Sequence, residues 1–232
     1  MSSRLLSCIF AATALFTVGC DDSSGLSSGE AANVRVVNAS SVAGDLDVLV
    51  NEQAQANASD IAFLNSSARC VRVDASDPTL TLQQTGGTTI LPAQSFTFDE
   101  GGRNTLVVAG SGAGLRYINI SDPLTPELQS GRARIRVVNA RSTTGMGVTV
   151  TPWNQTAGTP QIINTTDAQA TGWVDVPANQ SVAIRMTTTG GTFIDVLNIV
   201  PTEGQELIVV ATDPATGTAP LRWVVTQSCS RP

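Results

Sequence analysis

The sequence Val-Arg-Val-Val-Asn-Ala at residues 34–39 recurs as Ile-Arg-Val-Val-Asn-Ala at residues 135–140, a spacing of about 100 residues. Further matches follow in the same order along the chain. They pair Val48–Val50 with Val148–Val150, Glu100–Gly101 with Glu203–Gly204, Leu106–Ala109 with Ile208–Ala211, and Leu115–Ile118 with Leu221–Val224. Self-similarity at one period indicates a repeated structural unit. The sequence therefore predicts two tandem copies of one domain.

Within each copy the apolar residues alternate with polar ones, as Val71 and Val73 do in the first copy. Alternation with a period of two is typical of half-buried strands. The unbroken apolar runs Leu106–Val108 and Leu207–Val210 indicate central strands that are covered on both faces. About seven short strands in about 100 residues is the pattern of an immunoglobulin-like domain. We therefore predict an all-β fold of two tandem immunoglobulin-like antiparallel β-sandwich domains.

The repeat also predicts the domain boundaries. Residues 1–19 are expected to form a signal peptide and residues 20–32 a flexible tether rich in glycine and serine. The first sandwich should span residues 33–120 and the second residues 133–229. Between them, residues 121–132 contain two prolines, which favour a semi-rigid linker.

The N-terminus has the features of an export signal. Arg4 supplies a positive charge, and the apolar residues 5–18 are too few to span a bilayer, which takes about 20 residues. The ending Gly19-Cys20 resembles the lipobox of bacterial lipoproteins, although Thr17 stands where leucine is usual. The resemblance implies an acyl chain on Cys20 that holds the protein to a membrane of the bacterial cell envelope, facing the periplasm or the cell surface. The alternative is an ordinary signal peptide with an incidental cysteine.

The absence of two residue types limits the chemistry of the chain. There is no histidine, and all 13 basic residues are arginine. Imidazole is the commonest general base near neutral pH, and lysine amines form Schiff bases, so we expect no enzyme, no cofactor and no metal site. The net charge of −6 argues against nucleic-acid binding. Arg132, Arg134 and Arg136 alternate along one expected strand, and we interpret them as its solvated face.

Two cysteines remain outside the N-terminal segment, Cys70 and Cys229. Export would place them in an oxidising compartment, where an even number of cysteines usually forms disulfides. We expect a bond between Cys70 and Cys229 that ties the two copies together. Two separate thiols, or a bond to another chain, are the alternatives, because sequence alone cannot show that the residues approach each other.

Few side chains are candidates for contact with a ligand. Trp153 has no counterpart in the first copy and lies in an expected loop, where an indole ring could stack on a sugar. Close acidic pairs also occur, and they are more typical of turns than of calcium binding or glycoside hydrolysis. The pairs are Asp45 with Asp47, Asp74 with Asp77, and Asp99 with Glu100.

The opening motif resembles a bacterial family. Arg-Val-Val-Asn-Ala at residues 35–39, followed by Asp-Val-Leu-Val-Asn at residues 47–51, is similar to the uncharacterised bacterial domain of unknown function four-three-nine-seven. Members occur singly or in tandem in exported and lipid-anchored proteins. Asn38 and Asn139 stand where histidine is frequent in the family. The resemblance spans most of residues 33–227 and implies no known active site.

Together these features favour a non-enzymatic, lipid-anchored cell-envelope protein that presents two β-sandwich domains in a structural or protein-interaction role. Its expected partners are the membrane, through acylated Cys20, and another envelope protein or a polysaccharide, but no nucleic acid. The alternative is a carbohydrate-binding envelope module in which Trp153 contacts the ligand.

Overall fold

The computed structural model describes residues 30–110, 114–122, 126–141, 146–152, 161–163, 170–188, 190–213 and 221–230. In these ranges the helical content is limited to short 3-10 turns, of which Ala56–Ala58 is the longest. No helix in the same ranges is long and apolar enough to cross a membrane. The predicted all-β fold is therefore confirmed.

Each half of the chain contributes eight strands in the described ranges, one more than the seven expected. The N-terminal half contains β1 (Ala31–Asn38), β2 (Leu46–Val50), β3 (Gln53–Ala54), β4 (Val71–Asp74), β5 (Thr79–Gln84), β6 (Thr88–Ser95), β7 (Arg103–Ala109) and β8 (Arg116–Asp122). The C-terminal half contains β9 (Arg132–Asn139), β10 (Met146–Pro152), β11 (Gln161–Ile163), β12 (Val174–Pro177), β13 (Val182–Thr188), β14 (Phe193–Ile199), β15 (Glu206–Thr212) and β16 (Arg222–Gln227).

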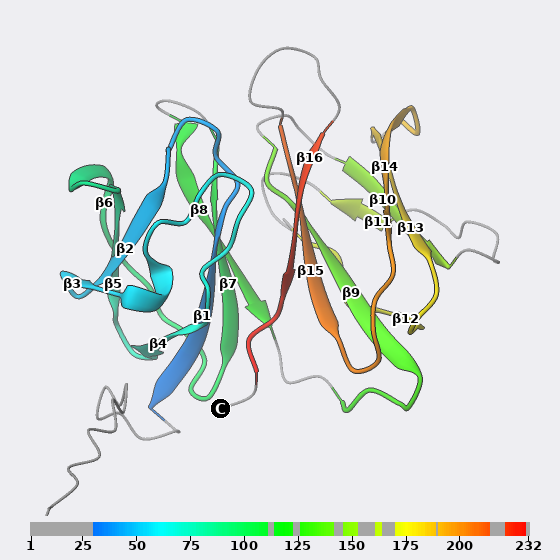
Figure 1. Cartoon of the computed structure of the whole chain (residues 1–232), viewed down its shortest axis with the longest axis horizontal. Coiled ribbons are helices and arrows are strands. Elements are labelled where there is room, and N and C mark those ends of the chain that lie inside the picture. The colour runs from blue at the N-terminus through cyan, green and yellow to red at the C-terminus, as the bar shows by residue number, and fades with distance from the viewer. Residues whose placement is uncertain are drawn as a thin grey trace, which may run out of the picture.

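The strands form four sheets that are stacked as layers (Figure 1). In the N-terminal half the outer sheet has the order β3-β2-β5-β6 and the inner sheet the order β4-β1-β7-β8. The C-terminal half has an outer sheet β11-β10-β13-β14 and an inner sheet β12-β9-β15-β16. The two orders correspond strand for strand. The inner sheets face each other across the middle of the molecule.

Each inner sheet contains one parallel pair, which the prediction of antiparallel sandwiches did not include. β1 runs parallel to β7, and β9 runs parallel to β15. A parallel pair needs a long connection, because the chain must return to the same end of the sheet before it starts the second strand. Here the strands β2 to β6 lie between β1 and β7 in the sequence and supply that connection.

Apolar side chains fill three cores, one between each pair of adjacent layers. The inner sheets contribute to two cores each, because successive residues of a strand point to opposite faces. On β7, Leu106 and Val108 pack in the N-terminal core, whereas Val107 and Ala109 pack between the two halves. The prediction that this apolar run is covered on both faces is therefore confirmed.

We name the apolar cluster between the two inner sheets the junction core. Its buried side chains come from both halves, and removing them from water favours contact between the halves. They are Val37, Ala39, Val107, Ala109, Ile118, Ile120, Val138, Ala140, Ile208, Val210 and Val224. The halves therefore share an interior and are not connected by the chain alone.

The first valine of the repeated Val-Val-Asn-Ala motif donates its backbone N–H to a side-chain hydroxyl in both halves. The N–H of Val36 donates to Ser67 Oγ at 3.2 Å, and the N–H of Val137 donates to Thr171 Oγ1 at 3.0 Å. In the N-terminal half this bond attaches the segment before β4 to β1, and in the C-terminal half it attaches the segment before β12 to β9. A hydroxyl residue at this place satisfies a buried N–H that no neighbouring strand reaches.

The asparagine of the motif organises the loop that follows the strand. Asn38 Oδ1 accepts a hydrogen bond from the N–H of Ser40, and Asn139 Oδ1 accepts one from the N–H of Arg141, both at 3.2 Å. Asn38 Nδ2 also donates to two loop carbonyls, at 2.8 and 2.9 Å. Both asparagines are buried. Their role in the described structure is therefore local hydrogen bonding.

The structure shifts the alignment of the halves by one residue over one strand. The sequence match equated Leu106 with Ile208, but Val36 pairs with Leu106, whereas its equivalent Val137 pairs with Val209. Leu106 and Val209 face the core of their own half, and Ile208 faces the junction core. A shift of one residue reverses the face of a strand side chain, so Val209 is the equivalent of Leu106.

Truncation of a side chain in the junction core should destabilise the molecule. We expect Ile208→Ala to lower the free energy of unfolding by about 2–5 kcal/mol, because Ile208 is fully buried and its loss leaves a cavity. Val225→Ala, at a residue of β16 that is 44% exposed, should change it by less than about 0.5 kcal/mol. Urea denaturation measures both variants, and equal effects would contradict a sealed junction.

Candidate functional site

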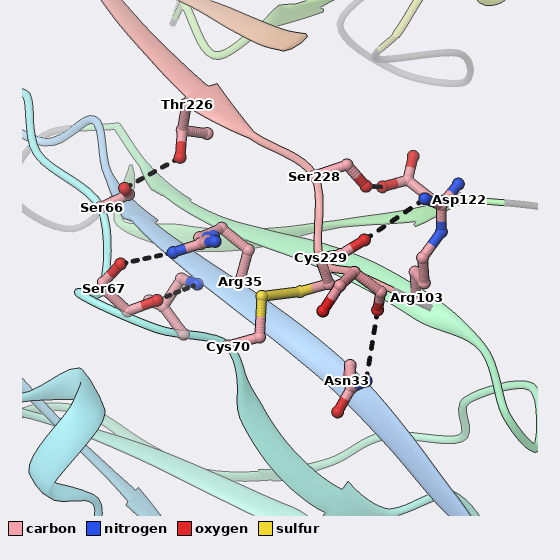
Figure 2. Close-up of a disulfide and its surroundings, with 12 residues drawn as sticks. Asn33, Arg35, Ser66, Ser67, Cys70, Arg103, Asp122, Thr226, Ser228 and Cys229 are labelled. Carbon is pink, nitrogen blue, oxygen red and sulfur yellow. Dashed lines mark hydrogen bonds between the residues drawn. A yellow bond between two sulfur atoms is a disulfide. The ribbon is translucent and has the colours of Figure 1, made fainter. Parts of the chain in front are cut away.

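The structure brings two of the four sequence-predicted site residues together. Cys70 directly precedes β4, Cys229 follows β16, and the two are joined by a disulfide with their Cα atoms 5.9 Å apart. The predicted bond is therefore confirmed, and it fastens one half of the chain to the other (Figure 2). Cys20 and Trp153 lie outside the described residues, so their roles stay predictions.

Hydrogen bonds between the halves accompany the disulfide. Ser66 Oγ lies 2.9 Å from Thr226 Oγ1 (Figure 2). Thr212 Oγ1 donates to the carbonyl oxygen of Ala39 at 2.6 Å, in a buried position. Both contacts join a residue of the N-terminal half to one of the C-terminal half. The junction is therefore held by directional bonds as well as by apolar contact.

A glutamate bridges two buried arginines across the junction. Glu206, the first residue of β15, forms an ion pair with Arg103 of β7 and lies 3.4 Å from Arg134 of β9. The arginine side chains are only 2% and 4% exposed. Arg103 Nη1 also donates to the carbonyl oxygen of Cys229 at 3.3 Å, beside the disulfide (Figure 2). An unpaired charge in the interior is costly. The burial of Arg103 in one half therefore depends on its pairing with Glu206 of the other half.

A second ion pair lies next to the first. The carboxylate of Asp122, at the end of β8, accepts hydrogen bonds from Arg136 Nη1 and from Ser228 Oγ, each at 2.9 Å. Burial raises the pKa of Asp122, and the hydrogen bonds and the charges of Arg136 and Arg103 oppose that rise. The guanidinium of Arg136 lies 6.0 Å from the ring centre of Trp173. The whole group therefore serves to join β8 to β9 and β16.

The interpretation of the β9 arginines as a solvated strand face is wrong. Arg134 is buried, and the side chain of Arg136 is only 16% exposed. Arg134 Nη2 donates to the carbonyl oxygen of Pro126 at 2.8 Å. The alternation correctly placed the two arginines on one face of the strand, but the N-terminal half covers that face.

A polar pocket of about 710 Å³ opens beside the ion pairs. Arg103 and Glu206 line it, together with Glu127 and Glu203. The carboxylate of Glu203 accepts hydrogen bonds from the N–H of Gly131 at 2.7 Å and from a serine hydroxyl at 2.9 Å, which lower the pKa of Glu203. Within the pocket Arg103 is therefore ion-paired with Glu206, and the carboxylate of Glu203 is already hydrogen-bonded within the protein.

The acidic pairs act in local structure. Asp74 Oδ1 accepts hydrogen bonds from the N–H and the hydroxyl of Ser76, at 2.8 and 2.7 Å, and these bonds lower the pKa of Asp74. Asp47 Oδ1 accepts one from the N–H of Asp60 at 2.9 Å. The Asp74 arrangement is an Asx-type turn, as expected, whereas Asp47 of β2 binds a residue 13 positions further along the chain. In the part of the chain that the structure describes, no three side chains of the metal-ligating types lie together.

Sequence reasoning missed Arg103, Asp122 and Glu206. Each is a charged residue at the first or last position of its strand, a place where solvated charges are also common. One signal could have found two of them. When the halves are aligned at Gly101 and Gly204, the opposite charges of Arg103 and Glu206 fall at equivalent positions.

The layers and their ionic junction define an all-β protein of the β-sandwich class. The chain belongs to the family described as Domain of unknown function (DUF4397), which matches residues 32–151. The match begins in β1 and ends in β10, so it crosses the junction. No curated protein matches the chain.

Among solved structures, the chain is similar to a carbohydrate-binding module of family CBM26, CBMbc from Eubacterium rectale Amy13K, determined in complex with maltoheptaose. The two sequences are 11% identical, and the superposition covers 85% of this chain and 98% of that chain with a TM-score of 0.28. A likeness of this size carries no information on the function of the present chain.

Removal of the disulfide should weaken the whole fold. We expect replacement of Cys70 and Cys229 by serine to lower the free energy of unfolding by about 3–5 kcal/mol, because the bond closes a loop over a sequence separation of 159 residues. Guanidinium denaturation measures the loss. A reductant should destabilise the wild type similarly and leave the double variant unchanged; a reductant effect on the variant would contradict this assignment.

The raised pKa of Asp122 predicts a pH effect of defined sign. Between its ordinary value of 3.8 and the raised value, the folded protein binds more protons than the unfolded chain, so stability falls as pH rises through that window. The stability of the wild type relative to Asp122→Asn should therefore increase as pH is lowered from 7 towards 4. Denaturant titrations over that range test this. Glu203→Gln, which removes a carboxyl group with a lowered pKa, should show the opposite and smaller trend.

Proposed function

We propose that this protein is a non-enzymatic, lipid-anchored protein of the bacterial cell envelope. It presents two joined β-sandwiches in a structural or protein-interaction role. The observation that carries the proposal is the junction, where the buried Arg103 and Asp122 and the partly buried Glu206 are paired with groups of the opposite half. The carboxylates of Asp122 and Glu206, a group type that elsewhere performs acid–base chemistry, are here engaged in holding the halves together.

The disulfide supports the proposed location. The bond between Cys70 and Cys229 is of the kind that forms and persists in oxidising compartments such as the bacterial periplasm. The same compartment is where the N-terminal export pattern and its lipobox-like ending at Cys20 would deliver the mature chain. The short Gly/Ser-rich tether would then separate the sandwiches from the lipid surface.

We also infer that the chain holds two tandem copies of the family domain, at residues 33–120 and 133–229. What supports this is the identical strand order of the halves. The equivalent contacts of Val36 with Ser67 and of Val137 with Thr171 support it as well. A shared strand order and shared motifs are what a duplicated unit would retain.

Crosslinking of the full chain in living cells, followed by mass spectrometry, tests the interaction role. We expect one envelope protein, or the chain itself, to be captured repeatedly at the same surface. Binding of the purified chain to a glycan panel, lost on Trp153→Ala, would instead favour the carbohydrate-binding alternative. Hydrolysis of any substrate by the chain, lost on Asp74→Asn, would contradict the non-enzymatic role.

The anchor gives a direct prediction. Cys20→Ala should abolish incorporation of a labelled palmitate and move the protein from the membrane fraction to the soluble fraction, because the acceptor thiol is gone. Cys8→Ala, within the signal peptide, is the matched control and should leave both properties unchanged. Labelling that survives Cys20→Ala would show that the lipid acceptor is another residue.

A further inference from the structure

The edge strand β14 is less protected than its equivalent β6. Each lies at the end of its outer sheet, and no other described strand pairs with its free edge. β6 contains Pro92, which has no N–H to donate, and its register with β5 shifts twice. β14 contains no proline, and its pairing with β13 is regular from Asp195 to Ile199. β14 therefore offers an ordered backbone edge to a further strand, apart from the N–H of Val196, which already donates to Asp195 Oδ1.

Exposed apolar side chains gather on β14 and directly after it. Phe193 is 53% exposed, Val196 is 40% exposed, and Val200, directly after β14, is 63% exposed. These are three of the five large exposed hydrophobic residues in the described ranges. On β6 the exposed positions hold threonine, proline, alanine, glutamine and serine. An apolar stripe beside an open hydrogen-bonding edge is typical of a surface to which another strand is added.

We propose that β14 pairs antiparallel with β14 of a second copy of this chain, about a two-fold axis at Asn198. The sequence Val-Leu-Asn-Ile-Val at residues 196–200 has nearly the same character in both directions. Antiparallel pairing about Asn198 places Val196 opposite Val200 of the second copy and Leu197 opposite Ile199. Each direct cross-strand pair is then apolar with apolar, or amide with amide at the axis. A two-fold interface requires this self-complementarity, because the same surface meets itself.

The charge distribution favours this occupant. The chain has a net charge of −6, so the repulsion between two copies is smallest where the surfaces in contact carry no charge. Residues 196–200 carry no charge. The neighbouring carboxylate of Asp195 is held within its own subunit, where it accepts hydrogen bonds from the N–H of Val196 at 2.8 Å and from the indole N–H of Trp223 at 3.4 Å. No like charges would face each other across the pairing.

The dimer would join two outer sheets into one continuous sheet, and it would leave the junction of each subunit untouched. It deepens the proposed interaction role, on which it rests, by naming the partner as a second copy. It does not depend on the lipid anchor, because β14 and Cys20 belong to different parts of the chain.

Two matched variants test the pairing. Asn198→Asp places two carboxylates opposite each other at the axis, whereas Ser95→Asp adds the same group at the equivalent, exposed position of β6. The equivalence follows from the pairing of Ser95 with Thr79 and of Asn198 with Ala183. In sedimentation velocity of the full chain, the wild type and Ser95→Asp should dimerise with the same dissociation constant. Asn198→Asp should raise that constant by about fivefold or more, because like charges directly opposite destabilise a strand pair.

Acid and hydrogen exchange complete the test. Protonation of the new carboxylates at low pH should restore the Asn198→Asp dimer. In the wild type, amide exchange at residues 195–200 should slow as the protein concentration rises, which tests the surface without any variant. A chain that is monomeric at every concentration overturns the proposal, as does a dimer that the two variants weaken equally or that neither weakens. A monomer that still captures one envelope protein in cells overturns the dimer alone and leaves the proposed function standing.

Discussion

The contact between the two inner sheets is the constraint on which the rest of the structure depends. β7 and β15 are apolar on both faces, so an inner sheet that packed only against its own outer sheet would leave a second apolar face in water. Each inner sheet covers that face of the other. Neither half is therefore complete by itself, and the outer sheets occupy the two remaining sides.

The ion pairs at one end of the junction restrict how the two inner sheets can be placed relative to each other. Aliphatic side chains pack well in several relative placements, because apolar contact is not directional. The pairs of Arg103 with Glu206 and of Arg136 with Asp122 form only in one placement, and another packed placement of the halves would leave buried charges without a partner. We interpret these pairs as setting the placement of the halves, with the disulfide beside them maintaining it.

The two halves share a topology without sharing their contacts. Val71 pairs with Val34 and Val174 pairs with Ile135, so Cys70 and Trp173 occupy equivalent positions just before their strands. Cys70 is bonded to Cys229, whereas Trp173 lies against Arg136. The outer edges differ in the same way, because β6 carries a proline and β14 an apolar stripe. The two halves have the same strand order, but different side chains at equivalent positions give them different surfaces.

The sequence by itself determined the all-β class, the repeated order of elements and the cysteines available to pair, because alternation, turn residues and composition are local or countable properties. It did not show the parallel pairing of β1 with β7 or the one-residue shift that makes Val209 the equivalent of Leu106. Only the tertiary structure decided which side of β9 is covered, and so that Arg134 is buried rather than solvated. Alternation along the sequence shows which residues share a face of a strand. Whether that face is buried depends on residues far away in the sequence, such as Glu206, and a local pattern contains no information about them.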